Sequence, residues 1–353
     1  MSYQGIIDRY SQYLPVKPEC RVTLFEGNTP LLPSVRLVHT LKSKIKLYYK
    51  LEGLNPTGSF KDRGMTYAVS KAVEAGSHVV ICASTGNTSA AAAAYAARAG
   101  IQAVVLIPAG KIALGKLSQA MIHGAKIFQV TGNFDDAFLA VKDLAKRMPL
   151  TIVNSINPHR LAGQETAAYE IVDQLGDAPD FHFIPVGNAG NITAYGRGYQ
   201  RFHGEKKATQ VPKMMGYQAA GAAPIVLGRV VKHPETIATA IRIGNPASWQ
   251  DALVIKEQTG GLIDKVTDKE ILAAYQKVAA LDGYFCEPAS AASIAGLMKY
   301  DAAVGLPEDA IVVCTLTGHG LKDSDTAIKI SPKPIRVKPK VEAILKHLKL
   351  KNL

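Results

Sequence analysis

A lysine at a predicted turn-to-helix junction is the residue of this chain best placed for covalent chemistry. Lys61 follows a turn at residues 55–58, and apolar residues at helical spacing between Phe60 and Val73 predict a helix that ends at Gly76. The start of a helix carries a partial positive charge, so it favours a neutral amine or an imine over an ammonium ion. Lys61 is thus a candidate nucleophile toward an aldehyde, although the charged run 61–63 is also typical of an ordinary solvated helix start.

A polar loop separates a predicted strand at 78–83 from a predicted helix at 88–99. Its members are Ser84, Thr85, Gly86, Asn87 and Thr88. Their small side chains leave backbone N–H groups uncovered, and free N–H groups at a helix start attract a carboxylate or a phosphate. The loop is therefore a candidate anion site, with simple helix capping by Thr88 as the alternative.

A glycine-rich loop lies between a predicted strand at 181–186 and a predicted helix at 191–202. Its members are Gly187, Asn188, Ala189, Gly190 and Asn191. The two glycines let the backbone approach phosphate oxygens closely, while successive N–H groups point inward. The Walker lysine is missing and the spacing is not that of a dinucleotide fingerprint, so the loop indicates a different kind of phosphate cradle. A glycine turn required only for steric reasons is the alternative.

Thr317 lies in a third loop of this kind, since it follows a predicted apolar strand at 311–316 and precedes Gly318. Its hydroxyl is a neutral partner for a ring nitrogen, although a threonine before glycine is also common in plain turns. Glu287 precedes Pro288 at the start of a predicted helix at 289–300, where helix capping or acid–base work are both open.

Short apolar strands alternate with helices along the chain, a pattern typical of parallel α/β sheets. Strands are predicted at 78–83, 103–107, 127–130, 151–153, 181–186, 213–217 and 311–316, and helices at 88–99, 135–147, 163–175, 191–202, 268–281 and 289–300. The fold class is therefore α/β, with two open-sheet lobes that carry helices on both faces. We expect a small domain of 55–150 and a large domain of 1–54 and 151–353. Ligands bind at the carboxyl ends of such strands, where all three loops lie.

Composition narrows the class of protein further. Half of the net charge of +12 belongs to the tail, since nine Lys or Arg stand against three Asp or Glu from Lys322 onward. Three prolines break this tail, and apolar residues at helical spacing from Val341 to Leu348 predict a short helix at its end. No aromatic residues alternate with its lysines, so we expect no nucleic-acid partner.

The four cysteines, Cys20, Cys82, Cys286 and Cys314, are widely spaced, and no two histidines stand three or four residues apart. We therefore expect neither disulfides nor a bound metal. No apolar run is long enough for a membrane span and the N-terminus lacks a leader pattern, so we expect a cytoplasmic protein without membrane contact.

Together the ordered motifs resemble those of pyridoxal-phosphate enzymes of the tryptophan-synthase-β type, and within them the bacterial threonine synthase family. The resemblance rests on residues 24–31, 55–64, 83–94, 154–158, 185–194, 243–249 and 317–323. It covers about nine tenths of the chain and leaves out the basic tail. One departure is His319, where the family often has asparagine beside the cofactor ring.

The resemblance implies a role for each motif. Lys61 would form the Schiff base with pyridoxal 5′-phosphate, Asn87 would bind the phenolic oxygen of the cofactor, the loop from Gly187 to Asn191 would bind its phosphate, and Thr317 would meet its pyridine nitrogen. Family members convert O-phospho-L-homoserine and water into L-threonine and phosphate, and they commonly form homodimers. The substrate would be bound by Ser84, Thr85, Thr88, Asn154, Ser155 and Arg160, of which the last three would hold the departing phosphate. The alternatives are a threonine or serine dehydratase of the same fold and a binding protein without catalytic activity.

Overall fold

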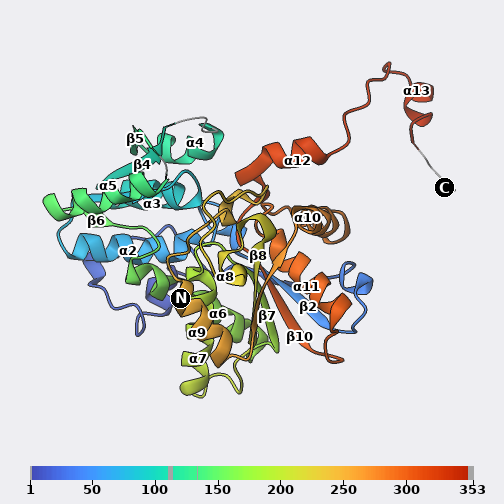
Figure 1. Cartoon of the computed structure of the whole chain (residues 1–353), viewed down its shortest axis with the longest axis horizontal. Coiled ribbons are helices and arrows are strands. Elements are labelled where there is room, and N and C mark those ends of the chain that lie inside the picture. Colours follow the sequence, from blue (N-terminus) through green and yellow to red (C-terminus); the bar gives the residue numbers. More distant parts are fainter. Residues whose placement is uncertain (1, 110–113, 133, 349–353) are drawn as a thin grey trace. The chain divides into compact units, whose positions relative to one another are not determined.

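The computed structural model of the chain describes residues 2–109, 114–132 and 134–348. The chain divides into two units, Met1–Asp323 and Ser324–Leu353, and the described residues of the first form two β-sheets (Figure 1). The smaller sheet has the order β5 (Lys126–Val130), β4 (Gln102–Pro108), β3 (Val79–Ala83) and β6 (Thr151–Ile152). The larger has the order β1 (Leu31–Pro33), β2 (Lys46–Leu51), β10 (Ile311–Leu316), β7 (Phe181–Pro185), β8 (Lys213–Ala219) and β9 (Leu262–Val266). The predicted α/β class with two open sheets is confirmed.

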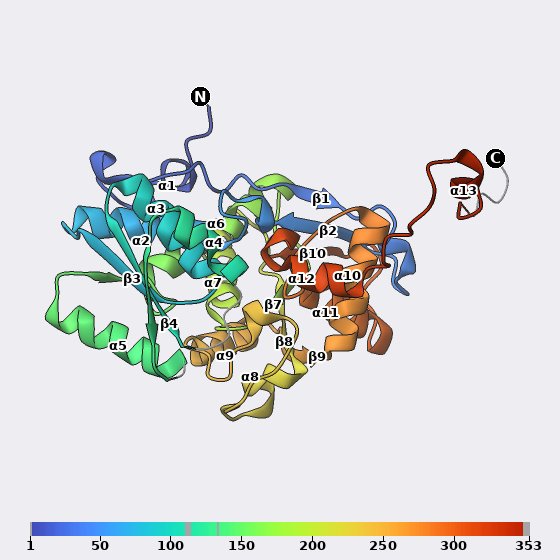
Figure 2. The same cartoon turned by 90° about the horizontal axis from the view of Figure 1, so that it is seen from above.

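The smaller sheet is parallel throughout and is covered on both faces. Its helices are α2 (Lys61–Glu74), α3 (Asn87–Ala99), α4 (Leu114–Ile122) and α5 (Phe134–Arg147). Successive side chains of a strand point to opposite faces. Accordingly Cys82 of β3 packs with residues of α2, α3 and α4, whereas Ile81 packs with residues of α5. Figure 2 shows α5 on the opposite side of β3 and β4 from α2 and α3.

The larger sheet is parallel except for its edge strand β1. Its longer helices are α6 (Pro158–Leu175), α7 (Gly190–Gly204), α9 (Trp249–Gln258), α10 (Asp268–Asp282) and α11 (Ala291–Ala303), and two short ones are α1 (Ile6–Arg9) and α8 (Pro224–Leu227). Ile184 of β7 packs in one cluster with residues of α6, α7 and α9. Its neighbour Phe183 faces the other way, with its ring 6.1 Å from that of Tyr300 in α11. Both faces of this sheet are therefore covered as well.

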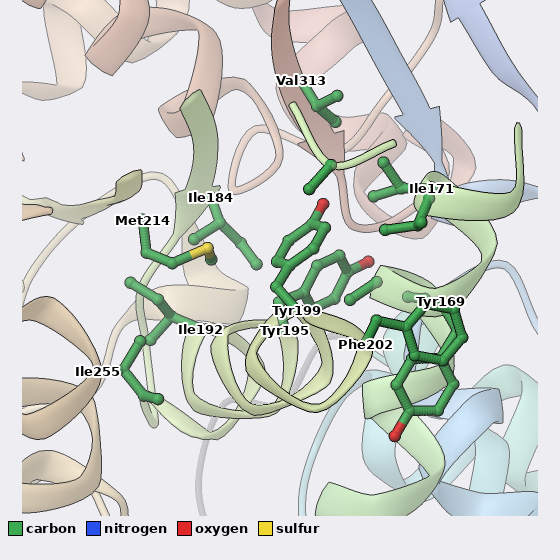
Figure 3. Close-up of a cluster of buried hydrophobic side chains, with 14 of the residues drawn as sticks. Tyr169, Ile171, Ile184, Ile192, Tyr195, Tyr199, Phe202, Met214, Ile255 and Val313 are labelled. Atoms are coloured by element: carbon green, nitrogen blue, oxygen red, sulfur yellow. The ribbon is translucent and has the colours of Figure 1, made fainter. Parts of the chain in front are cut away.

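The core between the larger sheet and α6 and α7 is rich in tyrosine (Figure 3). Tyr169 and Phe202 stack with ring centroids 4.3 Å apart, which joins the two helices. The buried His182 is bonded on both ring nitrogens, to the hydroxyl of Tyr199 at 2.8 Å and to that of Thr315 at 2.7 Å. Burial and the charge of Lys50 lower the pKa of His182 to about 3, so the imidazole is neutral.

A buried cluster of charges ties α2 to α6 and to β2. Arg63 donates to Glu52 from Nε at 2.7 Å and to Glu170 from Nη2 at 2.6 Å, and Lys50 donates to Glu170 at 2.9 Å. None of the four side chains is more than 1% exposed. Two positive and two negative charges balance, as burial of ions requires. Because Arg63 lies two residues after Lys61, this cluster anchors the start of α2.

Glycines allow α2 and α6 to touch at their first turns. A Cβ added at Gly163 would lie 2.1 Å from the carbonyl oxygen of Arg63, and one at Gly64 would lie 2.7 Å from that of Arg160. Distances below 3 Å are steric clashes, so both positions require glycine. The contact places the beginning of α6 directly beside Lys61.

The second unit contains α12 (Ser324–Ile330) and α13 (Val341–Leu345), joined by a segment that holds Pro332, Pro334 and Pro339. The short helix predicted near the end of the tail is confirmed by α13. Apolar side chains remain exposed in this unit, including Ile335, Val341 and Ile344. No helix in the described ranges is long and apolar enough to cross a membrane, and in the same ranges no three His, Cys, Asp or Glu side chains gather as a metal ion would require.

Several elements of the larger sheet and its helices differ from the sequence-based expectation. Strands β1, β2 and β9 and helix α9 were not predicted, and β2 and β9 each contain two charged residues that interrupt the apolar pattern. Helix α6 begins at Pro158 rather than at Gly163, with the side chain of Asn157 accepting the N–H of His159 as its cap. In addition, β6 pairs with β3, so the smaller sheet extends just past residue 150.

Candidate active site

Lys61 and Thr317 lie on two turns that are hydrogen-bonded to each other. Lys61 is the first residue of α2, as predicted, and Thr317 follows the carboxyl end of β10. The N–H of Phe60 donates to the carbonyl oxygen of Thr317 at 3.0 Å, and the N–H of His319 donates to that of Gly58 at 2.9 Å. These two bonds hold the candidate nucleophile next to the candidate ring partner, although the two are far apart in the sequence.

The amine of Lys61 lies in surroundings that favour its neutral form. Its Nζ lies 4.2 Å from the centroid of the Phe60 ring, and no described residue accepts a hydrogen bond from it or pairs with it. The pKa of Lys61 is lowered from 10.5 to about 7, mainly by burial and secondarily by the positive charge of Arg160, while the negative charge of Glu287 raises it. About half of the amine is therefore neutral, and hence nucleophilic, at pH 7.

Arg160 is a buried cation without a buried anion. Its side chain is 1% exposed, and one of its nitrogens donates to the carbonyl oxygen of Val153 at 3.1 Å. Its Nε has no partner, and no described carboxylate lies within ion-pair distance of the guanidinium. Burial lowers the pKa of Arg160 to about 10, so the group is charged at neutral pH. A buried, unpaired guanidinium fits an anionic ligand with two oxygens to offer.

The glycine-rich loop leads from β7 into the start of α7. Ala189 has the left-handed φ of 64° and caps the helix, and Gly190 is its first residue. A Cβ at Gly187 would lie 3.0 Å from the Cα of Ile241, and one at Gly190 would lie 3.2 Å from the side chain of Leu161. Both glycines therefore keep the backbone close to neighbouring segments. Leu161 follows Arg160 in α6, so the loop lies near the start of that helix.

The two asparagines of the same loop differ in their contacts. Asn188 is used structurally, because its Oδ1 accepts the N–H of Ala247 at 3.2 Å and its carbonyl oxygen accepts that of Ser248 at 3.1 Å. Asn191 is 9% exposed, and both of its amide atoms are buried without a hydrogen-bond partner among the described residues. Buried polar atoms are nearly always paired, so the amide of Asn191 fits a ligand that hydrogen-bonds to it.

Asn87, the first residue of α3, reaches across to Glu287. Its Nδ2 donates to the two carboxylate oxygens at 3.3 and 3.1 Å. The N–H of Glu287 in turn donates to the carbonyl oxygen of Gly318 at 2.9 Å, next to Thr317. Glu287 is not a helix cap, since Ser290 occupies that position before α11. The polar loop after β3 is thereby connected to the turn that carries Thr317.

The remaining substrate-binding candidates differ in how accessible they are and in whether their side chains are already hydrogen-bonded. Ser84, Thr85 and Thr88 are partly accessible, and the hydroxyls of the two threonines make no hydrogen bond to a described residue. Ser155 is partly accessible as well. Asn154 is largely occupied: its Oδ1 accepts the N–H of Ala83 and its Nδ2 donates to the carbonyl oxygen of the same residue, each at 3.0 Å. That side chain extends the pairing of β3 with β6 and retains one amide hydrogen.

Thr317 keeps its hydroxyl proton for a ligand if Ser290 donates to it. The two hydroxyl oxygens are 2.9 Å apart, and that of Ser290 also accepts the N–H of Gly318 at 2.9 Å. A hydroxyl has one proton to donate and two lone pairs to accept with. When the Ser290 proton points to Thr317, the proton of Thr317 is available to a ring nitrogen.

Two charged residues of the site were not predicted from the sequence. The carboxylate of Asp62 accepts the N–H of Thr57 at 2.7 Å and its hydroxyl at 2.5 Å, which fixes the turn before Lys61. The amine of Lys322 donates to the carbonyl oxygen of Thr57 at 2.9 Å and to the side chain of Gln119 in α4. Both read as ordinary surface charges in the sequence, and only the fold brings them to this turn.

Comparison with known proteins defines the class first. Residues 22–318 match the family model described as "Pyridoxal-phosphate dependent enzyme". A threonine synthase of Synechocystis sp. is 55% identical over 349 residues, which are 98% of this chain and 91% of that protein. A threonine synthase of Mycobacterium leprae is 56% identical over 348 residues, and one of Methanocaldococcus jannaschii is 52% identical over 351 residues. These two alignments each cover 97% of this chain, with 96% and 86% of the respective relatives. The chain therefore belongs to the threonine synthase family of pyridoxal-phosphate-dependent enzymes.

Solved structures agree with this at the level of the fold. The structure of maize serine racemase matches with a TM-score of 0.75 at 19% identity, over 93% of this chain and 97% of that chain. The processed form of threonine deaminase isoform 2 from Solanum lycopersicum also matches with a TM-score of 0.75, at 22% identity, over 93% and 89%. At such identities the likeness concerns the fold alone.

Pyridoxal phosphate fits the donor set of this site. The unpaired amide of Asn191 and the backbone N–H groups of the loop at the start of α7 suit a phosphate. The partly neutral amine of Lys61 suits an aldehyde. Thr317 lies on the neighbouring turn, which is hydrogen-bonded to the turn that carries Lys61.

Proposed function

We propose that this protein converts O-phospho-L-homoserine and water into L-threonine and phosphate, with Lys61 as the residue that binds pyridoxal phosphate. Membership of the threonine synthase family supports the reaction. The observation that carries the proposal in the structure is the second anion site: Arg160 is buried, unpaired and close enough to Lys61 to lower its pKa. A substrate with a phosphate as well as a carboxylate offers this guanidinium an anion of its own.

Four elements would hold the cofactor. The backbone N–H groups from Gly187 to Asn191, with Asn188 and Ala189 between them, and the start of α7 would bind its phosphate. Asn87 would donate to its phenolic oxygen, and Thr317 would donate to its pyridine nitrogen. Pyridoxal phosphate, when bound, supplies the electron sink that lets protons leave carbon.

The substrate would be bound at both of its ends. The N–H groups and hydroxyls of Ser84, Thr85 and Thr88 would hold its carboxylate at the start of α3. The guanidinium of Arg160, with Ser155 and the remaining amide hydrogen of Asn154, would hold its phosphate. Binding at both ends fixes the carbon chain between them, next to Lys61.

Lys61 would also move protons. With a pKa of about 7, its Nζ accepts a proton from carbon and returns it with little cost in either direction at neutral pH.

Product analysis tests the reaction. Purified protein loaded with pyridoxal phosphate should release phosphate from O-phospho-L-homoserine and form threonine in equal amount. A dehydratase of the same fold would instead form 2-oxobutanoate from threonine and leave phosphohomoserine intact, and a binding protein would do neither. Rapid 2-oxobutanoate formation without phosphate release would contradict the proposal.

A variant pair tests the anion site. Arg160→Ala should lower kcat/KM for phosphohomoserine about 100-fold or more, because two charge-assisted hydrogen bonds are lost, while cofactor affinity changes little. Arg229→Ala removes an exposed arginine and serves as the control, with kcat/KM unchanged. Equal losses of substrate use and cofactor affinity in Arg160→Ala would place this residue elsewhere.

We further propose that the protein is a cytoplasmic homodimer, in keeping with the resemblance to its family, and that 55–150 moves as a small domain against 1–54 and 151–353. Light scattering of the purified protein measures whether it forms a dimer. A monomer at micromolar concentration with full activity would contradict it.

A further inference from the structure

The carboxylate of Glu287 is held in one place by the backbone around it. Its residue is 5% exposed, its N–H donates to the carbonyl oxygen of Gly318 at 2.9 Å, and a Cβ at Gly318 would lie 2.4 Å from Oε1. The absence of a side chain at Gly318 is therefore what gives the carboxylate its position. From there it accepts Nδ2 of Asn87 with both oxygens, at 3.3 and 3.1 Å.

The contact decides which way the amide of Asn87 points. A side-chain amide has two hydrogens on its nitrogen and none on its oxygen, and the two ends are nearly equal in size. An ionised carboxylate accepts hydrogen bonds only, so it attracts the nitrogen and repels the oxygen. With one hydrogen directed at Glu287, the second hydrogen of the same nitrogen is directed away from Glu287 and remains available.

Charged neighbours act in opposite directions on this carboxylate. Burial raises the pKa of Glu287 and the negative charge of Asp323 adds to this rise, whereas the hydrogen bond from Asn87 and the positive charges of Lys322 and Lys61 favour the ionised form. A neutral carboxylic acid could donate a proton to the amide oxygen and permit the opposite orientation.

We propose that Glu287 is a positioning residue that acts through Asn87: it holds Nδ2, rather than Oδ1, toward the phenolic oxygen of pyridoxal phosphate. The inference rests on the proposed function, in which Asn87 meets that oxygen. The phenolic oxygen accepts hydrogen bonds when ionised, so the wrong amide orientation would place two acceptors against each other. Without Glu287, Asn87 would lose its preference between the two orientations.

A double-mutant cycle tests the proposal. Glu287→Gln keeps the size of the side chain but can donate as well as accept, so both orientations of Asn87 become possible. The apoproteins of wild type, Glu287→Gln, Asn87→Ala and the double variant are titrated with pyridoxal phosphate by fluorescence, and the visible absorption band of the lysine-bound cofactor is followed against pH. Glu287→Gln should weaken cofactor binding about 10-fold and move the pH midpoint of the band, as Asn87→Ala does, because both lose one hydrogen bond to the phenolic oxygen.

The decisive result is the effect of Glu287→Gln in the Asn87→Ala background. If Glu287 acts through Asn87, the second substitution adds less than a 2-fold change. An equal 10-fold loss in both backgrounds, or no effect of Glu287→Gln in either, would overturn the proposal. Glu287→Asp, which shortens the side chain and keeps the charge, should give an intermediate affinity and provides the same cycle if the glutamine variant does not fold.

A buried carboxylate elsewhere provides the matched control. Asp301, 4% exposed in α11, accepts the backbone N–H groups of Lys42 and Ser43. Asp301→Asn should lower stability without moving the pH midpoint of the band, and a shift there would assign the Glu287 effect to general loosening and overturn the proposal. A wild-type protein that shows no cofactor band at all would reject the proposed function itself, and this inference with it.

Discussion

The lowered pKa of Lys61 predicts an unusually fast reaction of the apoprotein with pyridoxal phosphate at neutral pH. Only the neutral amine attacks an aldehyde. An amine with the ordinary pKa of 10.5 is neutral in about one molecule in 3,000 at pH 7, whereas one with a pKa of about 7 is neutral in about half. The available nucleophile is therefore greater by roughly three orders of magnitude.

Two substitutions should move this titration in opposite directions. Arg160→Gln removes a positive charge that disfavours the ammonium ion, so the pKa of Lys61 should rise. Glu287→Gln removes a negative charge that favours the ammonium ion, so the pKa should fall. Burial is the largest cause of the shift, so neither variant should restore a pKa near 10.5.

Stopped-flow mixing of apoprotein with excess pyridoxal phosphate measures the titration. The rate constant for appearance of the visible band should rise with pH, reach half its plateau near pH 7 and level off above pH 8. Nα-acetyl-lysine under the same conditions corrects for the ionisation of the cofactor, and Lys61→Ala should give no site-specific band. A midpoint above pH 9 in the wild type, or shifts of the same sign in the two charge variants, would refute the reasoning.

Three further predictions concern the framework of the site. Arg63→Met should destabilise the apoprotein by about 3–5 kcal/mol in denaturant unfolding, because the buried Glu52 loses its cationic partner and Glu170 loses one of its two. Lys44→Ala, which breaks an exposed ion pair, should cost less than about 1 kcal/mol. Gly187→Ala should weaken cofactor binding in a fluorescence titration about 10-fold or more, because its Cβ would press on the neighbouring chain, while Gly204→Ala at the open end of α7 should leave that affinity unchanged. The folded-state pKa of His182 is about 3, below its ordinary value of 6.5, so the unfolded state binds more protons between these two pH values. The free energy of unfolding should therefore fall with decreasing pH, by at most about 1.4 kcal/mol per pH unit. His182→Asn should reduce this slope in urea unfolding at pH 6.5, 5.5 and 4.5.

Local patterns in the sequence were sufficient for the elements that carry the site. The apolar run at 311–316 predicted β10 with both of its ends, and the position of Lys61 in the first turn of α2 followed from the turn residues before it. Strand, loop and helix follow one another directly at 84–88 and at 187–191, so short-range rules apply there. These are the positions where the sequence and the structure agree most closely.

Contacts between distant segments could not be predicted in this way. Lys50 interrupts the apolar pattern of β2, yet it is buried because Glu170, 120 residues later, accepts a hydrogen bond from its ammonium group. Gly163 looks like a helix boundary, but it lies inside α6, where the carbonyl of Arg63 leaves no room for a side chain. In each case the residue type is required by a contact with a residue that is distant in the sequence and close only in the folded protein.

Contacts between distant segments also bear on the choice between a synthase and a dehydratase. Helices α2 and α6 begin side by side, and α6 also meets the loop that begins α7, so the partial positive charges of three helix starts gather around Lys61 and Arg160. A cofactor phosphate bound at the start of α7, as proposed, would leave the guanidinium of Arg160 buried and unpaired. A buried ion without a partner costs several kcal/mol, so a substrate that carries a second phosphate is stabilised here by the removal of that penalty. Threonine and serine each have one anionic group, the carboxylate proposed to bind at the start of α3, and no second one to place against Arg160, so the site favours phosphohomoserine over either of them.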